Sequence, residues 1–282
     1  MKTQIDLRPS PIAGQWYPGK LENLLAGVNG YMDAATLPEI PGEIIAVIAP
    51  HAGYRYSGLV AGHAFAAVRG LSPDIVAVIS PMHQYFYQPL LTVAHTAYQT
   101  PLGSIPIEQD AVNSLDEHLK SDLGFGLTAI RNDQEHSLEI ELPFLQVALD
   151  GDFSLLPVMV RDQNARVVQS LGAALAKTVE SKKALLVAST DLSHFYPQKT
   201  AEILDHEMLS RIEAFDPLAV LQAEEQGKAF ACGRAAVAAV LWTAQEFGAD
   251  TVTIVKYATS GDVSGDYSQV VGYGAAVVSR QK

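Results

Sequence analysis

Short, almost continuously apolar segments recur along the chain, and longer amphipathic segments separate them. Residues 44–49, 75–79 and 184–188 contain almost no polar side chains. A strand that is apolar on both sides is buried on both faces, as strands of parallel sheets are. Helical patterns of ten to fifteen residues between such strands are typical of βαβ units. The sequence therefore predicts an α/β fold, a three-layer α/β/α sandwich around a parallel or mixed sheet.

The same patterns place the individual elements. Strands are expected at residues 43–49, 74–80, 90–96, 153–160, 184–190, 251–259 and 269–279. Helices are expected at residues 58–68, 108–120, 136–149, 164–179, 200–214, 216–226 and 233–247. Because no linker, internal repeat or block of charge interrupts this series, residues 1–282 are expected to form a single domain.

Composition excludes several classes of protein. Of the 282 residues, 48% are hydrophobic and 18% charged, which is enough apolar material for a large core and argues against disorder. The net charge of −12 argues against a general nucleic-acid binder, which needs a basic face. The apolar runs are too short to cross a bilayer, so no membrane association is expected. A single cysteine, Cys232, fits a reducing cytoplasm.

Polar side chains of one kind follow three of the predicted strands. His51 comes after the first strand, His83 after the second, and Asp191 and His194 after the strand at 184–190. Ligands of open α/β sheets bind outside the carboxyl ends of the strands. We therefore expect these side chains to share one site. Asp191 and His194 are expected in one turn, where the carboxylate would raise the pKa of the imidazole.

Cys232 lies just before a predicted helix, and two interpretations of it are open. A lone cysteine is commonly buried and inert. A helix N-terminus can instead lower a thiol pKa and favour the thiolate. With imidazoles converging nearby, a metal-bound thiolate is the better interpretation, and such mixed ligands suit iron, copper or zinc.

The pair Glu135-His136 opens the next predicted helix. Ser137 and the acids after it are explained as a helix cap and solvated carboxylates of a first turn. That explanation leaves out Glu135 and His136, which could orient a ligand or relay a proton.

Taken together, these segments resemble the Memo family, whose prokaryotic members are called AmmeMemoRadiSam system protein B. The similarity covers nearly the whole chain. Its motifs are residues 13–18 (AGQWYP), 49–54 (APHAGY), 56–58 (YSG), 81–83 (PMH), 100–103 (TPLG), 135–139 (EHSLE), 142–144 (LPF), 189–194 (STDLSH) and 232–234 (CGR).

The resemblance implies a fold shared with class III extradiol dioxygenases of the LigB type, which bind iron through two histidines and a carboxylate. His51 and His83 match the family's metal histidines, and Cys232 stands where the dioxygenases place a glutamate. His194 matches their acid/base histidine, and Asp191 lies in the same cavity. A thiolate in place of the carboxylate argues against ordinary ring cleavage.

The leading hypothesis is a cytoplasmic protein with a mononuclear transition metal held by His51, His83 and Cys232. Iron is the expected metal, with copper and zinc as alternatives. The site would perform or assist a redox or oxygen-linked reaction, with proton-handling groups at His194, Asp191, Glu135 and His136. The resemblance implies radical-SAM and companion proteins as partners, and a homo-oligomer is left open.

Two alternatives use the same cleft. The first is a peptide- or protein-binding module without turnover, for which Arg55 and Arg234 are the only nearby arginines. The second is a dioxygenase acting on a small aromatic molecule, with Tyr54, Arg55 and Tyr85 lining its pocket.

Overall fold

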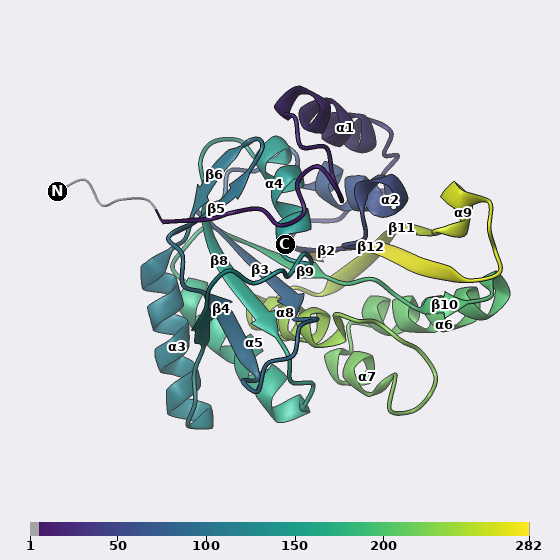
Figure 1. Cartoon of the computed structure of the whole chain (residues 1–282). Coiled ribbons are helices and arrows are strands. Elements are labelled where there is room, and N and C mark those ends of the chain that lie inside the picture. The colour runs from purple at the N-terminus through teal and green to yellow at the C-terminus, as the bar shows by residue number, and fades with distance from the viewer. Residues whose placement is uncertain (1–5, 282) are drawn as a thin grey trace.

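In this computed structural model, which describes residues 6–281, nine strands form one mixed sheet between two layers of helices (Figure 1). The strands are β2 (Glu43–Ala49), β3 (Ile75–Pro81), β4 (Leu90–Val93), β7 (Thr128–Ile130), β8 (Ser154–Val160), β9 (Ala184–Ser189), β10 (His194–Tyr196), β11 (Thr251–Thr259) and β12 (Val270–Arg280). Their order is β10-β12-β2-β9-β3-β8-β4-β7, and β11 pairs with β12. The predicted fold class, an α/β sandwich around a mixed sheet, is confirmed.

Four parallel strands form the centre of the sheet, in the order β2-β9-β3-β8. Ala49 at the end of β2 pairs with Ser189 at the end of β9, and Pro81 at the end of β3 pairs with Val160 at the end of β8. All four strands therefore finish at the same edge. The residues that follow them emerge side by side there, as the strand-end argument requires.

Helices cover both faces of this sheet, as Figure 1 shows. On one side lie α1 (Leu21–Asp33), α2 (Tyr54–Ala67) and α4 (Leu142–Ala148). On the other lie α3 (Gln109–Leu123), α5 (Ala165–Val179), α6 (Gln198–Glu213), α7 (Pro217–Gln222) and α8 (Arg234–Glu246). The remaining short helices are η1 (Glu139–Glu141), a 3-10 turn, and α9 (Gly261–Ser264).

The sequence of α8 fits its position between the sheet and α5. Seven consecutive residues, Ala235 to Leu241, are buried, and most of them are alanine or valine. Small side chains let the helix approach closely: a Cβ added at Gly172 of α5 would lie 2.7 Å from the Cβ of Trp242. An all-round apolar helix of this kind belongs inside a core rather than at a surface.

A second, three-stranded sheet carries the start of the described chain. It consists of β1 (Leu7–Arg8), β5 (Ala97–Thr100) and β6 (Gly103–Pro106), in the order β1-β5-β6. Strands β5 and β6 form a hairpin, and β1 runs parallel to β5. This pairing fixes the direction in which the chain continues past Arg8 toward the main sheet.

Several predicted boundaries are wrong. The helix expected at 136–149 is α-helical only from Leu142, because Pro143 fits the first turn of a helix and disrupts one in its interior. Helix α2 begins at Tyr54 rather than at residue 58, and α7 ends at Gln222 rather than at 226. Helix α1, with the short elements β1, β5, β6, β7, β10 and α9, was not predicted.

Within residues 6–281, none of the helices combines the length and the apolar character needed to cross a membrane.

Candidate metal centre

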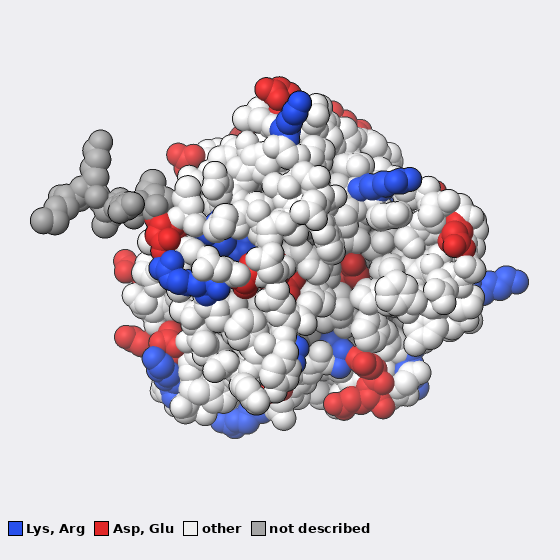
Figure 2. All heavy atoms as spheres, viewed as in Figure 1, with Lys and Arg blue, Asp and Glu red and all other residues white. Residues whose placement is uncertain are grey.

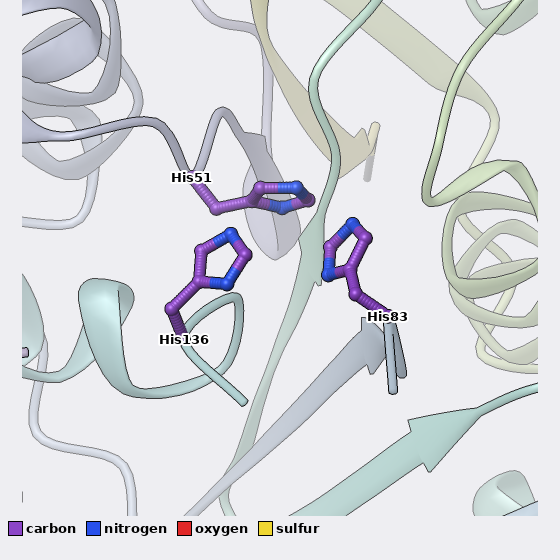
Figure 3. Close-up of side chains that lie close together, drawn as sticks. All are labelled: His51, His83 and His136. Atoms are coloured by element: carbon purple, nitrogen blue, oxygen red, sulfur yellow. The ribbon is translucent and has the colours of Figure 1, made fainter. Parts of the chain in front are cut away.

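Three histidines from different segments point toward one another at the carboxyl edge of the sheet (Figure 3). His51 follows β2, His83 follows β3, and His136 lies in the loop before η1. One ring nitrogen from each lies within 4.8 Å of the others, a spacing that could hold a metal ion. The ring centroids are 5.3 Å apart for His51 and His83, 5.4 Å for His51 and His136, and 4.8 Å for His83 and His136.

His51 is fixed from behind by the neighbouring strand. Its Nδ1 is hydrogen-bonded to Ser189 Oγ (2.9 Å), and that hydroxyl lies 2.7 Å from the carbonyl oxygen of Ser137. The hydroxyl has one proton, which it donates to Glu141 Oε1 at the shorter distance of 2.6 Å, so Nδ1 is the donor toward serine and Nε2 keeps its lone pair. Burial, with the nearby His136 and His83, holds the pKa of His51 well below its usual value. A neutral imidazole with a free nitrogen is the form that binds a metal.

His83 is oriented by Glu135. The carboxylate accepts hydrogen bonds from the backbone N–H of His83 (2.6 Å) and from its Nδ1 (2.9 Å), which leaves Nε2 free. A carboxylate behind a histidine in this way fixes the ring and raises its basicity as a ligand. Desolvation opposes protonation of His83, but the hydrogen bond and charge of Glu135 outweigh it and raise the pKa.

His136 lies between two aromatic neighbours. Its ring stacks on His83 at an interplanar angle of 17°, and Trp16 lies at a centroid distance of 4.1 Å. Burial lowers the pKa of His136 to about 4, although the nearby Glu135 acts in the opposite direction. The ring is therefore neutral at physiological pH and available as a ligand.

Cys232 lies against this cluster, although the three mutually close ligand atoms do not include its sulfur. The Sγ is 3.1 Å from Nε2 of His51 and accepts a hydrogen bond from the backbone N–H of Asp191 (3.2 Å). The expectation of a lowered thiol pKa is wrong for this environment. Desolvation and the charge of Asp191 raise the pKa of Cys232, and these effects exceed that of the helix start beside it.

Asp191 contacts the site through a hydrogen bond from the backbone of His51. Its Oδ1 accepts the backbone N–H of His51 (2.8 Å), and its Oδ2 lies 4.0 Å from His51 Nε2. Burial raises the pKa of Asp191 to about 7, despite the backbone hydrogen bonds that it accepts. This carboxyl group can therefore exchange a proton near neutral pH.

His194 differs from the sequence expectation. It begins the edge strand β10 instead of occupying a turn with Asp191, and its ring packs 5.4 Å from that of Phe230. We expected a neighbouring carboxylate to raise its pKa. Desolvation and the positive charge of His83 instead lower the pKa of His194.

A buried arginine that sequence reasoning missed supports the loop carrying Glu135 and His136. The guanidinium of Arg8 donates to both carboxylate oxygens of Asp133 (3.1 and 2.6 Å), to Glu139 Oε2 (2.6 Å) and to the carbonyl oxygen of Glu135 (2.8 Å). No local pattern in the sequence distinguishes Arg8 from a solvated arginine near a chain end. Only its pairing through β1 brings it into the interior.

The acids after His136 also differ from expectation. Glu139 and Glu141 were interpreted as solvated residues of a first helical turn, but both are fully buried. Glu139 accepts hydrogen bonds from Arg8 and from Tyr17 (2.7 Å), and Glu141 accepts one from Ser189 (2.6 Å). They are structural supports of the histidine cluster.

Three residues were suggested as the lining of a pocket for an aromatic substrate, and for Tyr54 this prediction is wrong. It is buried against Phe144, and its hydroxyl donates to the carbonyl oxygen of Ile140 (2.8 Å). Arg55 is exposed, with its guanidinium over Tyr56. Tyr85 is 69% exposed and lies under the guanidinium of Arg161.

The fold and the site define an α/β protein with a cluster of histidines at the carboxyl edge of a mainly parallel sheet. The chain belongs to the Memo family, because the family model described as "Memo-like protein" matches residues 8–277. The resemblance seen in the sequence motifs is thus confirmed.

Curated relatives agree over their full length. MEMO1 family protein MK0963 of Methanopyrus kandleri is 34% identical over 283 residues, which cover 97% of this chain and 99% of the relative. A MEMO1 family protein of Thermotoga maritima is 34% identical over 96% of this chain and 99% of its own. Among solved structures, the uncharacterized protein JW3007 of Escherichia coli K12 is similar with a TM-score of 0.53 and 13% identity. That match covers 83% of this chain and 100% of the other, and it supports the fold alone.

Proposed function

We propose that this Memo-family protein binds one transition-metal ion through His51 and His83, with a third ligand from His136 or Cys232, and uses it in a redox or oxygen-linked reaction. One observation carries the proposal: three imidazoles converge, and the Nδ1 atoms of two of them are engaged elsewhere. Imidazoles held in this way are preorganised for a metal at Nε2.

The third ligand distinguishes two forms of the site. His136 would complete a set of three nitrogen donors, which suits zinc, copper or iron. Cys232 would add a thiolate, and its raised pKa means that the metal itself would have to displace the thiol proton. Iron remains the first metal to test.

The surrounding residues would manage protons. A bound iron or copper ion would supply electron transfer or oxygen activation. Asp191, beside His51, can hold or release a proton near neutral pH. The lowered pKa of His194 favours its neutral form, which is the form that can accept a proton.

A binding module without turnover is the second candidate. Exposed aromatic side chains follow β3 and lie on β10: Tyr85 and Tyr87 are 69% and 87% exposed, and Phe195 is 69% exposed. Exposed aromatic groups of this kind are common at contact surfaces. Radical-SAM and companion proteins stay the predicted partners, and the cytoplasm stays the predicted compartment.

Metal analysis of protein purified without chelator, with and without oxygen, tests the proposal. His51→Ala and His83→Ala should each abolish stoichiometric metal, while His118→Ala, in α3, should retain it. The third ligand is identified by whichever of His136→Ala and Cys232→Ser loses the metal. Full metal content in the His51 and His83 variants would refute the site. Full metal content without oxygen uptake or reduction, with any reductant or aromatic compound supplied, would favour the binding module.

A further inference from the structure

A cavity of about 280 Å³ opens beside the histidine cluster, and His83 and Cys232 line part of it. Two arginines, Arg161 and Arg234, also line this cavity. We propose that this cavity binds a small organic carboxylate, held by Arg161 and Arg234 next to His83 and Cys232. The inference rests on the proposed function only in that the carboxylate would be the molecule presented to the metal centre.

Arg234 has an unused donor. It begins α8, its side chain is only 12% exposed, and its Nε has no hydrogen-bond partner among residues 6–281. Its Nη1 pairs with Glu224. A buried N–H without an acceptor is unfavourable, and a guanidinium binds a carboxylate through two parallel N–H groups. An oxyanion in the cavity that Arg234 lines would accept hydrogen bonds from the guanidinium N–H groups that Glu224 leaves free.

Arg161 supplies a second cation from a different segment. It directly follows β8, so it emerges at the same sheet edge as His83. Its guanidinium lies 5.5 Å from the ring centroid of Tyr85, and Nη1 is 3.5 Å from the carbonyl oxygen of Met82, which is a long hydrogen bond. Within residues 6–281 its guanidinium makes no other hydrogen bond, so most of its donors are available to a ligand.

The other lining residues favour a monoanion with an organic body. Arg161, Arg234 and Glu224 together give the cavity one net positive charge, and Glu224 lies at its exposed side. In Figure 2, acidic and basic atoms lie side by side over α7. Met82 and Phe230 add apolar walls. The volume lies at the small end of ligand sites, so the occupant is a small molecule.

Glu224 gives the proposal a distinctive signature. Its carboxylate forms an ion pair with Nη1 of Arg234, so it competes with a ligand carboxylate for the donors of that guanidinium. Removing its charge should therefore strengthen binding, whereas removing either arginine should weaken it. A purely structural role for the Arg234–Glu224 pair would not produce opposite effects.

Isothermal titration of the metal-free full chain tests the proposal independently of metal binding. The probes are benzoate, its neutral analogue benzamide, and inorganic phosphate. Benzoate should bind; Arg161→Gln and Arg234→Gln should each weaken it about tenfold or more, the loss expected for one charge-assisted hydrogen bond. Glu224→Gln should bind benzoate more tightly. Arg166→Gln, at a 71% exposed side chain on α5, should change nothing.

Four results would overturn the inference: no benzoate binding by the wild type, equal binding of benzamide, tighter binding of phosphate than of benzoate, or no gain in Glu224→Gln. If Arg234→Gln does not fold, Arg161→Gln and Glu224→Gln still decide the question. Because no metal is present, failure of the metal site cannot be mistaken for failure of this cavity.

Discussion

Replacing Arg8 by methionine should destabilise the protein strongly and weaken the metal centre at the same time. Methionine keeps much of the length of the side chain but removes its charge and its donors. Arg8 is 1% exposed, and its guanidinium makes hydrogen bonds to Asp133, Glu139 and the Glu135 carbonyl. Its loss leaves two buried carboxyl groups without their cation and frees the loop that carries His136.

The magnitude follows from the burial of this network. Removing one partner of a buried ion pair costs about 3–5 kcal/mol, because the remaining charge stays desolvated. For a chain of this size each kcal/mol lowers Tm by about 2 °C, so Arg8→Met should lower Tm by about 6–10 °C. Arg131 offers a matched control, since its side chain is 52% exposed in its ion pair with Asp6. Arg131→Met should cost at most about 1 kcal/mol.

Denaturant unfolding of both variants measures the difference, and metal titration follows the site. Arg8→Met should bind metal about tenfold more weakly, because Glu135 and His136 lose their support. Adding Asp133→Asn to Arg8→Met should recover part of the stability by removing one unpaired charge. Equal stability losses in Arg8→Met and Arg131→Met would refute the reasoning. So would a double variant less stable than Arg8→Met alone.

Three further predictions concern the surroundings of the site. Glu135→Gln should keep the fold but lower metal affinity by about 10–100-fold, measured by competition with a chelator, and unchanged affinity would contradict the orienting role. Gly233→Ala should lower both Tm and metal affinity, because the new Cβ would lie 2.2 Å from a backbone oxygen at the end of β9. Gly27 lies in α1 with open space around it, so Gly27→Ala should instead stabilise the protein by about 0.5–1 kcal/mol. Equal losses of stability in the Gly233→Ala and Gly27→Ala variants would show that packing around Gly233 is not the cause. Added Cu²⁺ should quench the fluorescence of Trp16, which packs on the cluster, so quenching should survive Trp242→Phe and disappear in Trp16→Phe.

Periodicity predicted the main sheet well, because buried parallel strands have a pattern that few other structures share. Residues 43–49 and 153–160 illustrate this, since both became strands within a residue of the expected bounds. Short elements had no such signal. Strand β1 has two residues and exists because β5 offers a partner, which is a tertiary cause that no local pattern records.

The site was only partly predictable for a related reason. His51 and His83 follow buried strands, so topology alone brings them together. The position of His136 depends on a loop held by Arg8, and the sequence gives no signal for that contact. The pKa expectation for Cys232 was wrong because it considered the nearby helix start but not desolvation or the charge of Asp191.

The strand order also determines when each strand can find its neighbours during synthesis. Strand β2 pairs with β9 and β12, so more than 130 residues must follow it before its first neighbour exists. At ~5–20 residues per second, a ribosome needs on the order of ten seconds for that stretch. The second edge of β2 stays open until residues 270–280 have been made. Strand β2, which precedes His51, is therefore apolar and unpaired along one edge until the last strand of the sheet has been made, and chaperone protection during synthesis would matter most over this interval.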